Sequence, residues 1–203
     1  MNTTARDLPV VDGLRLPPEL RTLLRPGELA ADRTGRVHRL PRFFYEVRSW
    51  SQAKELMLTP HVRLNELLVV DCQEHPRLLE EFPHYVPCAV GLLARVLEEL
   101  RARAGGSPVF VAANGGYRSP AHRRSAEAIG PHCWAAAADV YRIGDTFLNT
   151  QASIEKYATV ARDIAAEINA LPYGHQPGES DDHLHLDLGY PHLVPAGCDE
   201  ARL

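Results

Sequence analysis

The segment GPHCWAAAADVY, residues 130–141, and the segment DDHLHLDLG, residues 181–189, decide how we interpret this chain. In the second segment apolar and polar residues alternate strictly, and this alternation predicts a strand with one buried face. The first segment runs into AAADVYRI, residues 136–143, which also predicts a strand. Both predicted strands carry side chains of the kind that bind metals, so the same two stretches indicate the fold and a candidate site.

Three side chains in these stretches, His132, Asp139 and His185, predict a zinc site. Zinc binds imidazole nitrogen and carboxylate oxygen, and three protein ligands leave a fourth position open for water, as in catalytic sites. On one straight helix His132 and Asp139 would lie about 10.5 Å apart, so we expect a loop to bring them together. His183 shares a strand face with His185 because side chains repeat every two residues, but we assign only His185 as a ligand. The alternatives are structural histidines, or a metal-free polar pair of His132 and Asp139.

Working outward, periodicity and turn residues predict the other elements. Pro87 suits the first position of a helix, and Ser119-Pro120 is typical of an N-cap followed by proline. Residues 63–71 are expected to be irregular or a short strand. The predicted elements are strands over 42–50 and 108–113, helices over 87–104 and 151–171, and a short helix from 119 that stops near Gly130. We therefore expect an α+β fold with a small central antiparallel sheet and flanking helices.

The first 60 residues show little periodicity and carry many of the prolines and arginines. We interpret residues 1–60 as a partly irregular N-terminal extension, with short helical turns after Pro17-Pro18. Residues 61–203 would form the functional domain, because a chain of 203 residues is long enough for one good core.

Composition excludes several classes of function. A net charge of −4 and an isoelectric point near 6.2 argue against a general nucleic-acid-binding protein. The sequence contains no stretch of eighteen apolar residues, so it predicts no membrane-spanning helix. The N-terminus has no basic region followed by an apolar one, so we expect no secretory signal and a cytoplasmic location, with export by other means as the alternative. The widely spaced cysteines indicate free thiols, with one or two disulfides as the alternative: Cys72, Cys88, Cys133 and Cys198.

Three segments taken together, GYRSPAHR (116–123), HCWAAAAD (132–139) and DDHLH (181–185), resemble the zinc D-Ala-D-Ala carboxypeptidase family. That family includes the vancomycin-resistance D-Ala-D-Ala dipeptidases and shares its fold with the hedgehog signalling domain. The resemblance covers about residues 62–190 and implies this fold, with His132, Asp139 and His185 as the zinc ligands. The chain departs from the family pattern SxHxxGxAxD at Gly130, where the family has serine, and at Ala135, where it has glycine.

The resemblance also implies catalytic roles. Asp182, three residues before the last ligand, would accept a proton from water and pass it to the leaving amine, with Asp181 as a rival base. Arg118 would stabilise the oxyanion or grip a substrate carboxylate. His183 would hydrogen-bond to the intermediate or orient the base. Independently of the resemblance, Asp187 lies on the same face of the predicted strand as His185 and could orient a ligand histidine. For each of these the alternative is an ordinary surface or packing side chain.

The expected function is that of a zinc metallopeptidase acting on a peptide rich in D-amino acids. The amide bond would belong to a peptidoglycan fragment or to D-Ala-D-Ala. The alternative is a non-catalytic metal-binding or cell-wall-peptide-binding module of the same fold. Cys133, beside a ligand in sequence, is interpreted as a small buried residue rather than a nucleophile, because catalytic pairs are adjacent in space and not in chain.

Overall fold

The computed structural model describes residues 8–69, 74–81, 84–125, 128–175 and 181–198. It combines helices with antiparallel sheets, so the expected α+β class is confirmed. The largest sheet has five strands in the order β6-β7-β10-β9, with β8 paired to the outer part of β7. Their bounds are Val109–Val111 for β6, Ala137–Ile143 for β7, Thr146–Phe147 for β8, Asn169–Ala170 for β9 and Leu184–Asp187 for β10.

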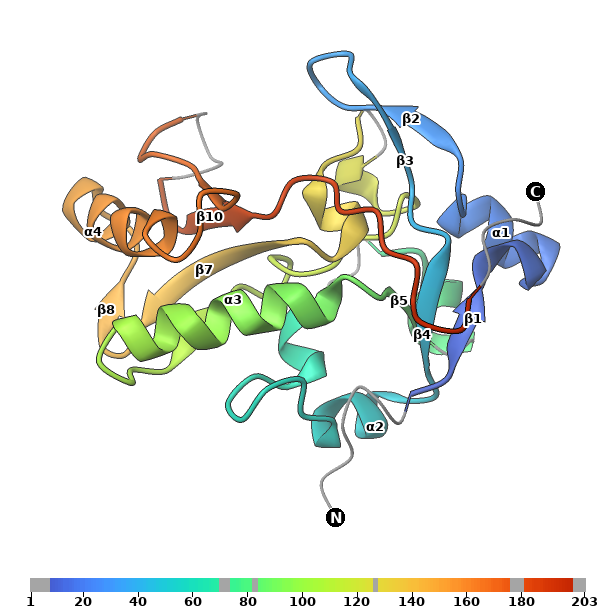
Figure 1. Ribbon diagram of the computed structural model, residues 1–203, viewed down its shortest axis with the longest axis horizontal. Coiled ribbons are helices and arrows are strands. Elements are labelled where there is room, and N and C mark those ends of the chain that lie inside the picture. The colour runs from blue at the N-terminus through green and yellow to red at the C-terminus, as the bar shows by residue number, and fades with distance from the viewer. Residues whose placement is uncertain (1–7, 70–73, 82–83, 126–127, 176–180, 199–203) are drawn as a thin grey trace.

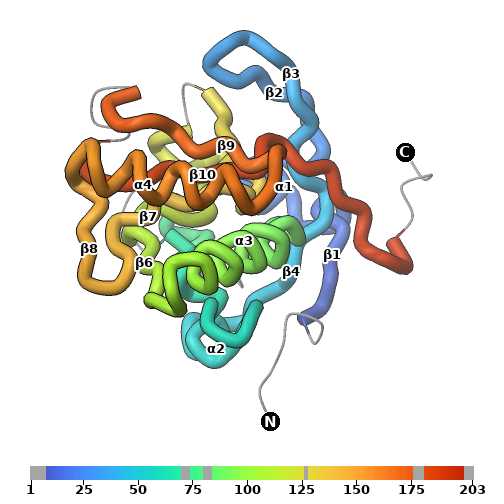
Figure 2. Tube along the Cα trace, turned by 60° about the vertical axis from the view of Figure 1, so that its left-hand side comes forward, coloured from blue at the N-terminus to red at the C-terminus, as the bar shows by residue number. Residues whose placement is uncertain are grey.

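Two long helices, α3 (Val90–Arg103) and α4 (Gln151–Arg162), lie side by side over one face of this sheet (Figures 1 and 2). Their apolar stripes are buried against Leu184 and Leu186, which alternate along β10 with its polar residues. The alternation predicted for this strand is therefore confirmed. The polar side chains of β10 are left on the face of the sheet opposite the helices.

Strands from the N-terminal half of the chain form a second, three-stranded sheet in the order β1-β4-β5 and a separate hairpin of β2 and β3. Figure 1 shows this sheet to the right of the larger one, with the hairpin projecting above. The strands are Val10–Asp12 (β1), Leu29–Ala31 (β2), Val37–Arg39 (β3), Phe43–Val47 (β4) and His84–Pro87 (β5). Two short helices belong to the same region, Pro18–Leu24 (α1) and Trp50–Glu55 (α2). The helical turn expected after Pro17-Pro18 is thus present as α1.

Tighter turns connect these elements. They are 3-10 helices over Gly13–Arg15, Leu64–Leu67, Arg123–Ser125 and Pro131–Trp134, and a π-helical turn over Arg77–Glu81. The one over Leu64–Leu67 occupies the segment expected to be irregular or a short strand. Within the described residues, no helix has both the length and the apolar character needed to cross a membrane.

Two element boundaries predicted in the first half of the chain are wrong. The strand expected over 42–50 ends at Val47, because the Ser49 side chain accepts a hydrogen bond from the backbone N–H of Gln52 and caps α2. The helix expected from Pro87 begins at Val90 instead. Pro87 is the last residue of the edge strand β5, a place where a missing N–H costs no ladder bond.

Three elements predicted in the second half also differ from the structure. No α-helix starts at Ser119, because its hydroxyl donates to the Glu74 carboxylate instead of capping a helix; residues 126–127 of that segment lie outside the described residues. The helix expected to reach residue 171 ends at Arg162, and β9 then pairs with β10. The strand expected over 108–113 is reduced to Val109–Val111 and is half-buried.

Candidate metal centre

The register of the central strands places two of the predicted ligands together. His185 on β10 lies directly opposite Asp139 on β7. His132 comes from the 3-10 helix Pro131–Trp134, and Ala135 at its end adopts a left-handed conformation with φ 52° that turns the chain into β7. The loop expected between His132 and Asp139 is this tight turn.

The three side chains converge on one point. Nδ1 of His185 lies 2.8 Å from Oδ1 of Asp139, and Nε2 of His132 lies 3.4 Å from the same oxygen. One ligand atom from each residue lies within 4.8 Å of the others, and His132 and Asp139 are buried. This group could hold a metal ion, as its sequence spacing predicted.

In His132 and in His185, the ring nitrogen that points away from Asp139 Oδ1 forms a hydrogen bond of its own. Nδ1 of His132 donates to the backbone oxygen of Gly116 at 2.8 Å, which leaves the Nε2 lone pair directed at Asp139. Nε2 of His185 lies 3.2 Å from Oδ2 of Asp187, which leaves Nδ1 directed inward. Such outer partners fix the tautomer and orientation of metal-binding histidines. The position of Asp187 agrees with the orienting role considered for it, and the donor set suits zinc.

The close packing of this region depends on glycine at residue 115. A Cβ there would lie 2.8 Å from both Cβ and the backbone oxygen of Asp139. The backbone of Gly115 in turn accepts a hydrogen bond from the Asp139 N–H at 2.8 Å. Glycine therefore lets the segment that carries Arg118 lie against the centre of β7.

The three side chains of the centre shift one another's pKa values. Burial by itself would raise the pKa of Asp139, but His132 and His185 outweigh it and hold that pKa well below its usual range. Burial by itself would lower the pKa of His185, but hydrogen bonds to Asp139 and Asp187 raise it to about 9. For His132 burial has the larger effect: it lowers the pKa even though Asp139 acts to raise it. Asp139 and Asp187 therefore stabilise positive charge on the His185 ring.

Arg118 lies beside the centre and forms a hydrogen bond with Asp139, one of its three members. Its Nη2 donates to Oδ2 of Asp139 at 2.5 Å, and its Nε donates to the backbone oxygen of Asn114 at 2.7 Å. Burial lowers the pKa of Arg118, and Asp139 opposes that shift. The guanidinium therefore fixes the second oxygen of Asp139 and lines the cleft at the same time.

His183 and Asp182 form a pair at the edge of the centre. Nδ1 of His183 lies 2.5 Å from Oδ1 of Asp182, and its Nε2 lies 3.5 Å from Oδ1 of Asp139. The side chain of Asp182 is 77% exposed, whereas that of His183 is 16% exposed. His183 lines the cleft, and Asp182 is not among the lining residues. Asp182 is therefore linked to the centre only indirectly, by its contact with His183.

The centre opens into a cleft of about 700 Å³. This volume lies within the range of roughly 300–1,000 Å³ that is typical of ligand sites. Besides the centre, its lining includes the turn of the β2–β3 hairpin, residues 123–125 and 128–131, Leu171, His175 and Tyr190. Apart from Gly130, the sequence analysis did not single out these residues; only the adjacent arginines in RSPAHRR gave a signal that could have been followed.

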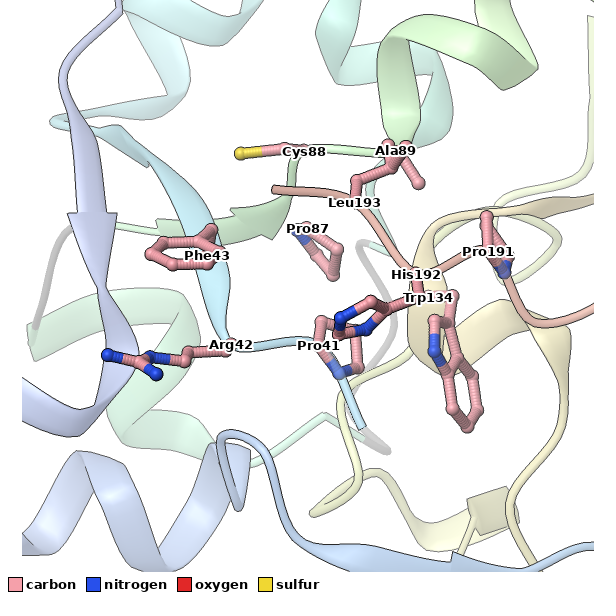
Figure 3. Close-up of a pocket in the computed structure, with 10 residues that line it drawn as sticks. All are labelled: Pro41, Arg42, Phe43, Pro87, Cys88, Ala89, Trp134, Pro191, His192 and Leu193. Carbon is pink, nitrogen blue, oxygen red and sulfur yellow. The ribbon is translucent and has the colours of Figure 1, made fainter. Parts of the chain in front are cut away.

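A second pocket, shown in Figure 3, lies between β4, the start of α3 and the segment after β10. Its volume of about 10 Å³ is close to that of one water position, so it admits no substrate. Cys88 lines this pocket, and burial raises the pKa of its thiol to about 12.

Cys133 is buried next to the centre, and its thiol donates to Oγ of Ser125 at 3.4 Å. Burial raises the pKa of Cys133, the opposite of what a thiolate nucleophile requires. Of the cysteines in the described part of the chain, Cys88, Cys133 and Cys198 are free, as expected; Cys72 lies outside it.

Comparison with known proteins adds no relative: the chain matches no protein-family model, no curated protein and no solved structure.

Proposed function

We propose that this chain is a zinc-dependent peptidase that hydrolyses an amide bond in a D-amino-acid-containing peptide, such as a peptidoglycan fragment or D-Ala-D-Ala, and that its fold is that of the zinc D-Ala-D-Ala carboxypeptidases. The observation that supports this most is the convergence of His132 Nε2, Asp139 Oδ1 and His185 Nδ1 in the lining of one open cleft. A structural zinc site is closed by four protein ligands, whereas a catalytic one leaves a position open.

Zinc bound at this centre would lower the pKa of a water molecule and polarise the scissile carbonyl. Among the protein groups, Nε2 of His183 is placed to accept the proton of the attacking water, because it faces the centre from the cleft. The carboxylate of Asp182 holds the proton on Nδ1 of His183, which keeps Nε2 available as a base. In this arrangement Asp182 is a positioning residue rather than the base itself.

Arg118 would serve the same reaction in two ways. Through Nη2 it keeps Asp139 oriented. The rest of its guanidinium lies in the cleft lining, where it can donate to a carbonyl oxygen as negative charge develops there. Removal of such a donor commonly costs about 10²–10³ in turnover.

A non-catalytic metal-binding or cell-wall-peptide-binding module is the second candidate. It is favoured by the exposure of Asp182 and by the engagement of Arg118 with Asp139, since both arrangements are compatible with a purely structural role. The two candidates differ in whether a peptide bond is broken.

The first experiment is zinc content per chain by elemental analysis, on the natural protein and on His185→Ala, purified without added metal. We expect about one zinc in the first and far less in the second.

D-Ala-D-Ala and peptidoglycan fragments are then incubated with the zinc-containing protein, and released amine is measured. His183→Ala should keep its zinc and lose about 10²–10⁴ in turnover, as expected for removal of a general base. Zinc retained in His185→Ala would exclude the proposed centre, and unchanged turnover in His183→Ala would exclude the proposed base.

A further inference from the structure

One arginine and three aromatic residues form a cluster on the outer part of the large sheet, at the end of β7 away from the three-stranded sheet (Figure 1). We refer to Phe110 on β6, Tyr141 and Arg142 on β7, and Phe147 on β8 as the Arg142 cluster. The guanidinium carbon of Arg142 lies 4.0 Å from the centroid of the Phe110 ring and 5.6 Å from that of Phe147. The ring of Tyr141 packs against both phenyl rings, at centroid distances of 6.2 and 6.5 Å.

The guanidinium of Arg142 has no polar partner among the residues that the structure describes. Its Nε is buried and makes no hydrogen bond, and no described carboxylate or carbonyl bonds to its Nη groups. The cation–π contacts engage the flat faces of the guanidinium, whereas its N–H donors point outward from the edge. A cation partly withdrawn from water in this way is matched best by a carboxylate, whose two oxygens can accept parallel hydrogen bonds from that edge.

The Arg142 cluster lies on the face of the sheet opposite α3 and α4. Val109 and Val111 pack against the core beneath these helices, so Phe110 between them points to the other face. Residues directly opposite each other on neighbouring antiparallel strands share a face. Phe110 lies opposite Arg142, and Arg142 lies opposite Phe147, so all three side chains are on that other face.

A β-bulge at Tyr141 brings Arg142 onto the same face as the candidate metal centre. The pairing of β7 with β6 moves from Arg142 to Val140 in one step, so Tyr141 is the extra residue. Asp139 and Arg142 are three positions apart and would point to opposite faces of a regular strand. With the bulge they share one face, roughly 10 Å apart at about 3.3 Å per residue. The strand therefore holds the cation at a set distance from the centre.

We propose that the Arg142 cluster binds a carboxylate of the peptide substrate, about three residues away from the bond held at the metal centre. Three residues of an extended peptide span the same distance of roughly 10 Å. The phenyl rings beside the guanidinium add apolar surface for the stem of an acidic side chain. The inference deepens the proposed function and rests on it in taking a peptide as substrate and the centre as the place of hydrolysis.

The first test is a binding measurement on the full chain by fluorescence polarisation. The probes are labelled alanine pentapeptides with blocked ends, which carry either one glutamate or one glutamine at the same position. We expect the glutamate peptide to bind about tenfold more tightly, which corresponds to about 1.4 kcal/mol. This preference should shrink as salt is raised from about 0.05 to 0.5 M, because exposed charges are screened. Equal binding of the two peptides would overturn the proposal.

Two variants locate the effect. Arg142→Gln should reduce the preference to about twofold or less, because the carboxylate loses its partner. Phe147→Ala removes a side chain that is 54% exposed, so the fold should be kept, and the preference should fall to about threefold as water reaches the guanidinium. A full preference in both variants would overturn the proposal.

Lys156→Gln is the matched control. It also removes one positive charge that lies over an aromatic ring, 4.7 Å from the centroid of Tyr157, but Lys156 is exposed on α4 and not on the face of the centre. It should keep the tenfold preference. A loss equal to that of Arg142→Gln would mean that net charge alone attracts the peptide, which would overturn the assignment to the Arg142 cluster.

The spacing is measured with alanine peptides that carry a hydroxamate, a zinc-binding group, at one end. A glutamate is placed at each successive position from the hydroxamate, which is at the carboxyl end in one series and at the amino end in the other. In one series we expect the tightest binding with the glutamate at about the third residue, and Arg142→Gln should remove that maximum. No dependence on position in either series would overturn the proposed spacing.

These outcomes separate this inference from the proposed function. The glutamate preference is read without hydrolysis and without the hydroxamate, and peptide integrity is checked by mass spectrometry. A preference that depends on Arg142, with no affinity gained from the hydroxamate, would support the carboxylate site and count against the metal centre. Hydrolysis of glutamate and glutamine peptides at equal rates and with equal affinity would support the peptidase and overturn the role of the Arg142 cluster.

Discussion

At the scale of single residues, Ala135 and Ala136 are adjacent and both fully buried, but only Ala135 has a positive φ. A left-handed conformation costs a residue with a Cβ roughly 1–2 kcal/mol, and glycine avoids that cost. Loss of a buried methyl costs about 0.8 kcal/mol. We therefore expect Ala135→Gly to leave the free energy of unfolding nearly unchanged. The measurement is urea denaturation followed by circular dichroism.

Ala136→Gly is the matched control, because it removes the same methyl without relieving strain. It should lower the free energy of unfolding by about 1–2 kcal/mol, from the lost methyl and the added backbone entropy of glycine. Equal destabilisation by both substitutions would mean that the turn before β7 carries no strain at Ala135.

Glu74 is a buried carboxylate that fixes the segment next to the centre. One of its oxygens accepts from the Ser119 hydroxyl, and the other accepts from the Ser119 N–H at 3.3 Å. Because Ser119 directly follows Arg118, this pair of bonds positions the guanidinium that contacts Asp139. Glutamine offers one acceptor oxygen instead of two, so Glu74→Gln should cost about 1–3 kcal/mol in stability. Zinc affinity, measured by competition with a chromogenic chelator, should fall in the same variant.

Glu55→Gln, an exposed residue on α2, serves as the control for that substitution and should change neither quantity. If Glu74→Gln lowered stability but left zinc affinity unchanged, Glu74 would be a packing residue without influence on Arg118.

At the scale of elements, the bond between β1 and the start of β4 provides a test of pH dependence. Arg42 donates to both carboxylate oxygens of Asp12, at 2.7 and 2.9 Å. The hydrogen bonds to Arg42 lower the pKa of Asp12 below its ordinary value of 3.8, against the effect of burial. A lowered carboxyl pKa means stability that is present above pH 3.8 and is lost as pH falls through the folded-state value.

We therefore expect Asp12→Asn to lower the free energy of unfolding by about 1 kcal/mol at pH 7, with the difference from the natural protein shrinking below pH 4. Denaturant titrations at pH 7, 5, 4 and 3 measure it. Asp145→Asn, in the exposed turn between β7 and β8, should give no such dependence. A constant difference from pH 7 to pH 3 would show that the Asp12 charge does not contribute.

The elements that could be predicted from the sequence are those whose signal is local. β10 follows from strict alternation, and the group that could hold a metal ion follows from a pattern of His132, Asp139 and His185, which lie on the turn before β7, on β7 and on β10. Trp50 was predicted to end a strand but begins α2, because the helix cap at Ser49 outweighs the strand propensity of tryptophan. The end of α4 was missed because the pairing of β9 with β10, a contact between distant segments, decides where that helix stops. Propensity alone does not contain such pairings.

At the scale of the whole molecule, the cleft joins segments that are far apart in sequence. The hairpin turn near residue 33, the turn near residue 124 and the centre on β7 and β10 all line it. The sequence indicated the centre because Asp139 and His185 lie on strands with a local sequence signal, and His132 lies on the turn just before the first of them. It did not indicate that the first 60 residues reach the site, since the contact of Asp32 with His38 and Tyr190 depends on packing that no local pattern encodes.

Zinc should stabilise the whole chain through the two central strands. A ligand that binds only the folded protein adds about 1.4 kcal/mol to the free energy of unfolding for each tenfold rise in free ligand above the dissociation constant. We expect this slope when unfolding is measured at a series of buffered free zinc concentrations, because His132, Asp139 and His185 meet only when the turn before β7 and the register of β10 are formed. His185→Ala should abolish the slope, whereas calcium, which prefers oxygen ligands, should produce none. The same slope in His185→Ala would place the stabilising zinc elsewhere on the molecule.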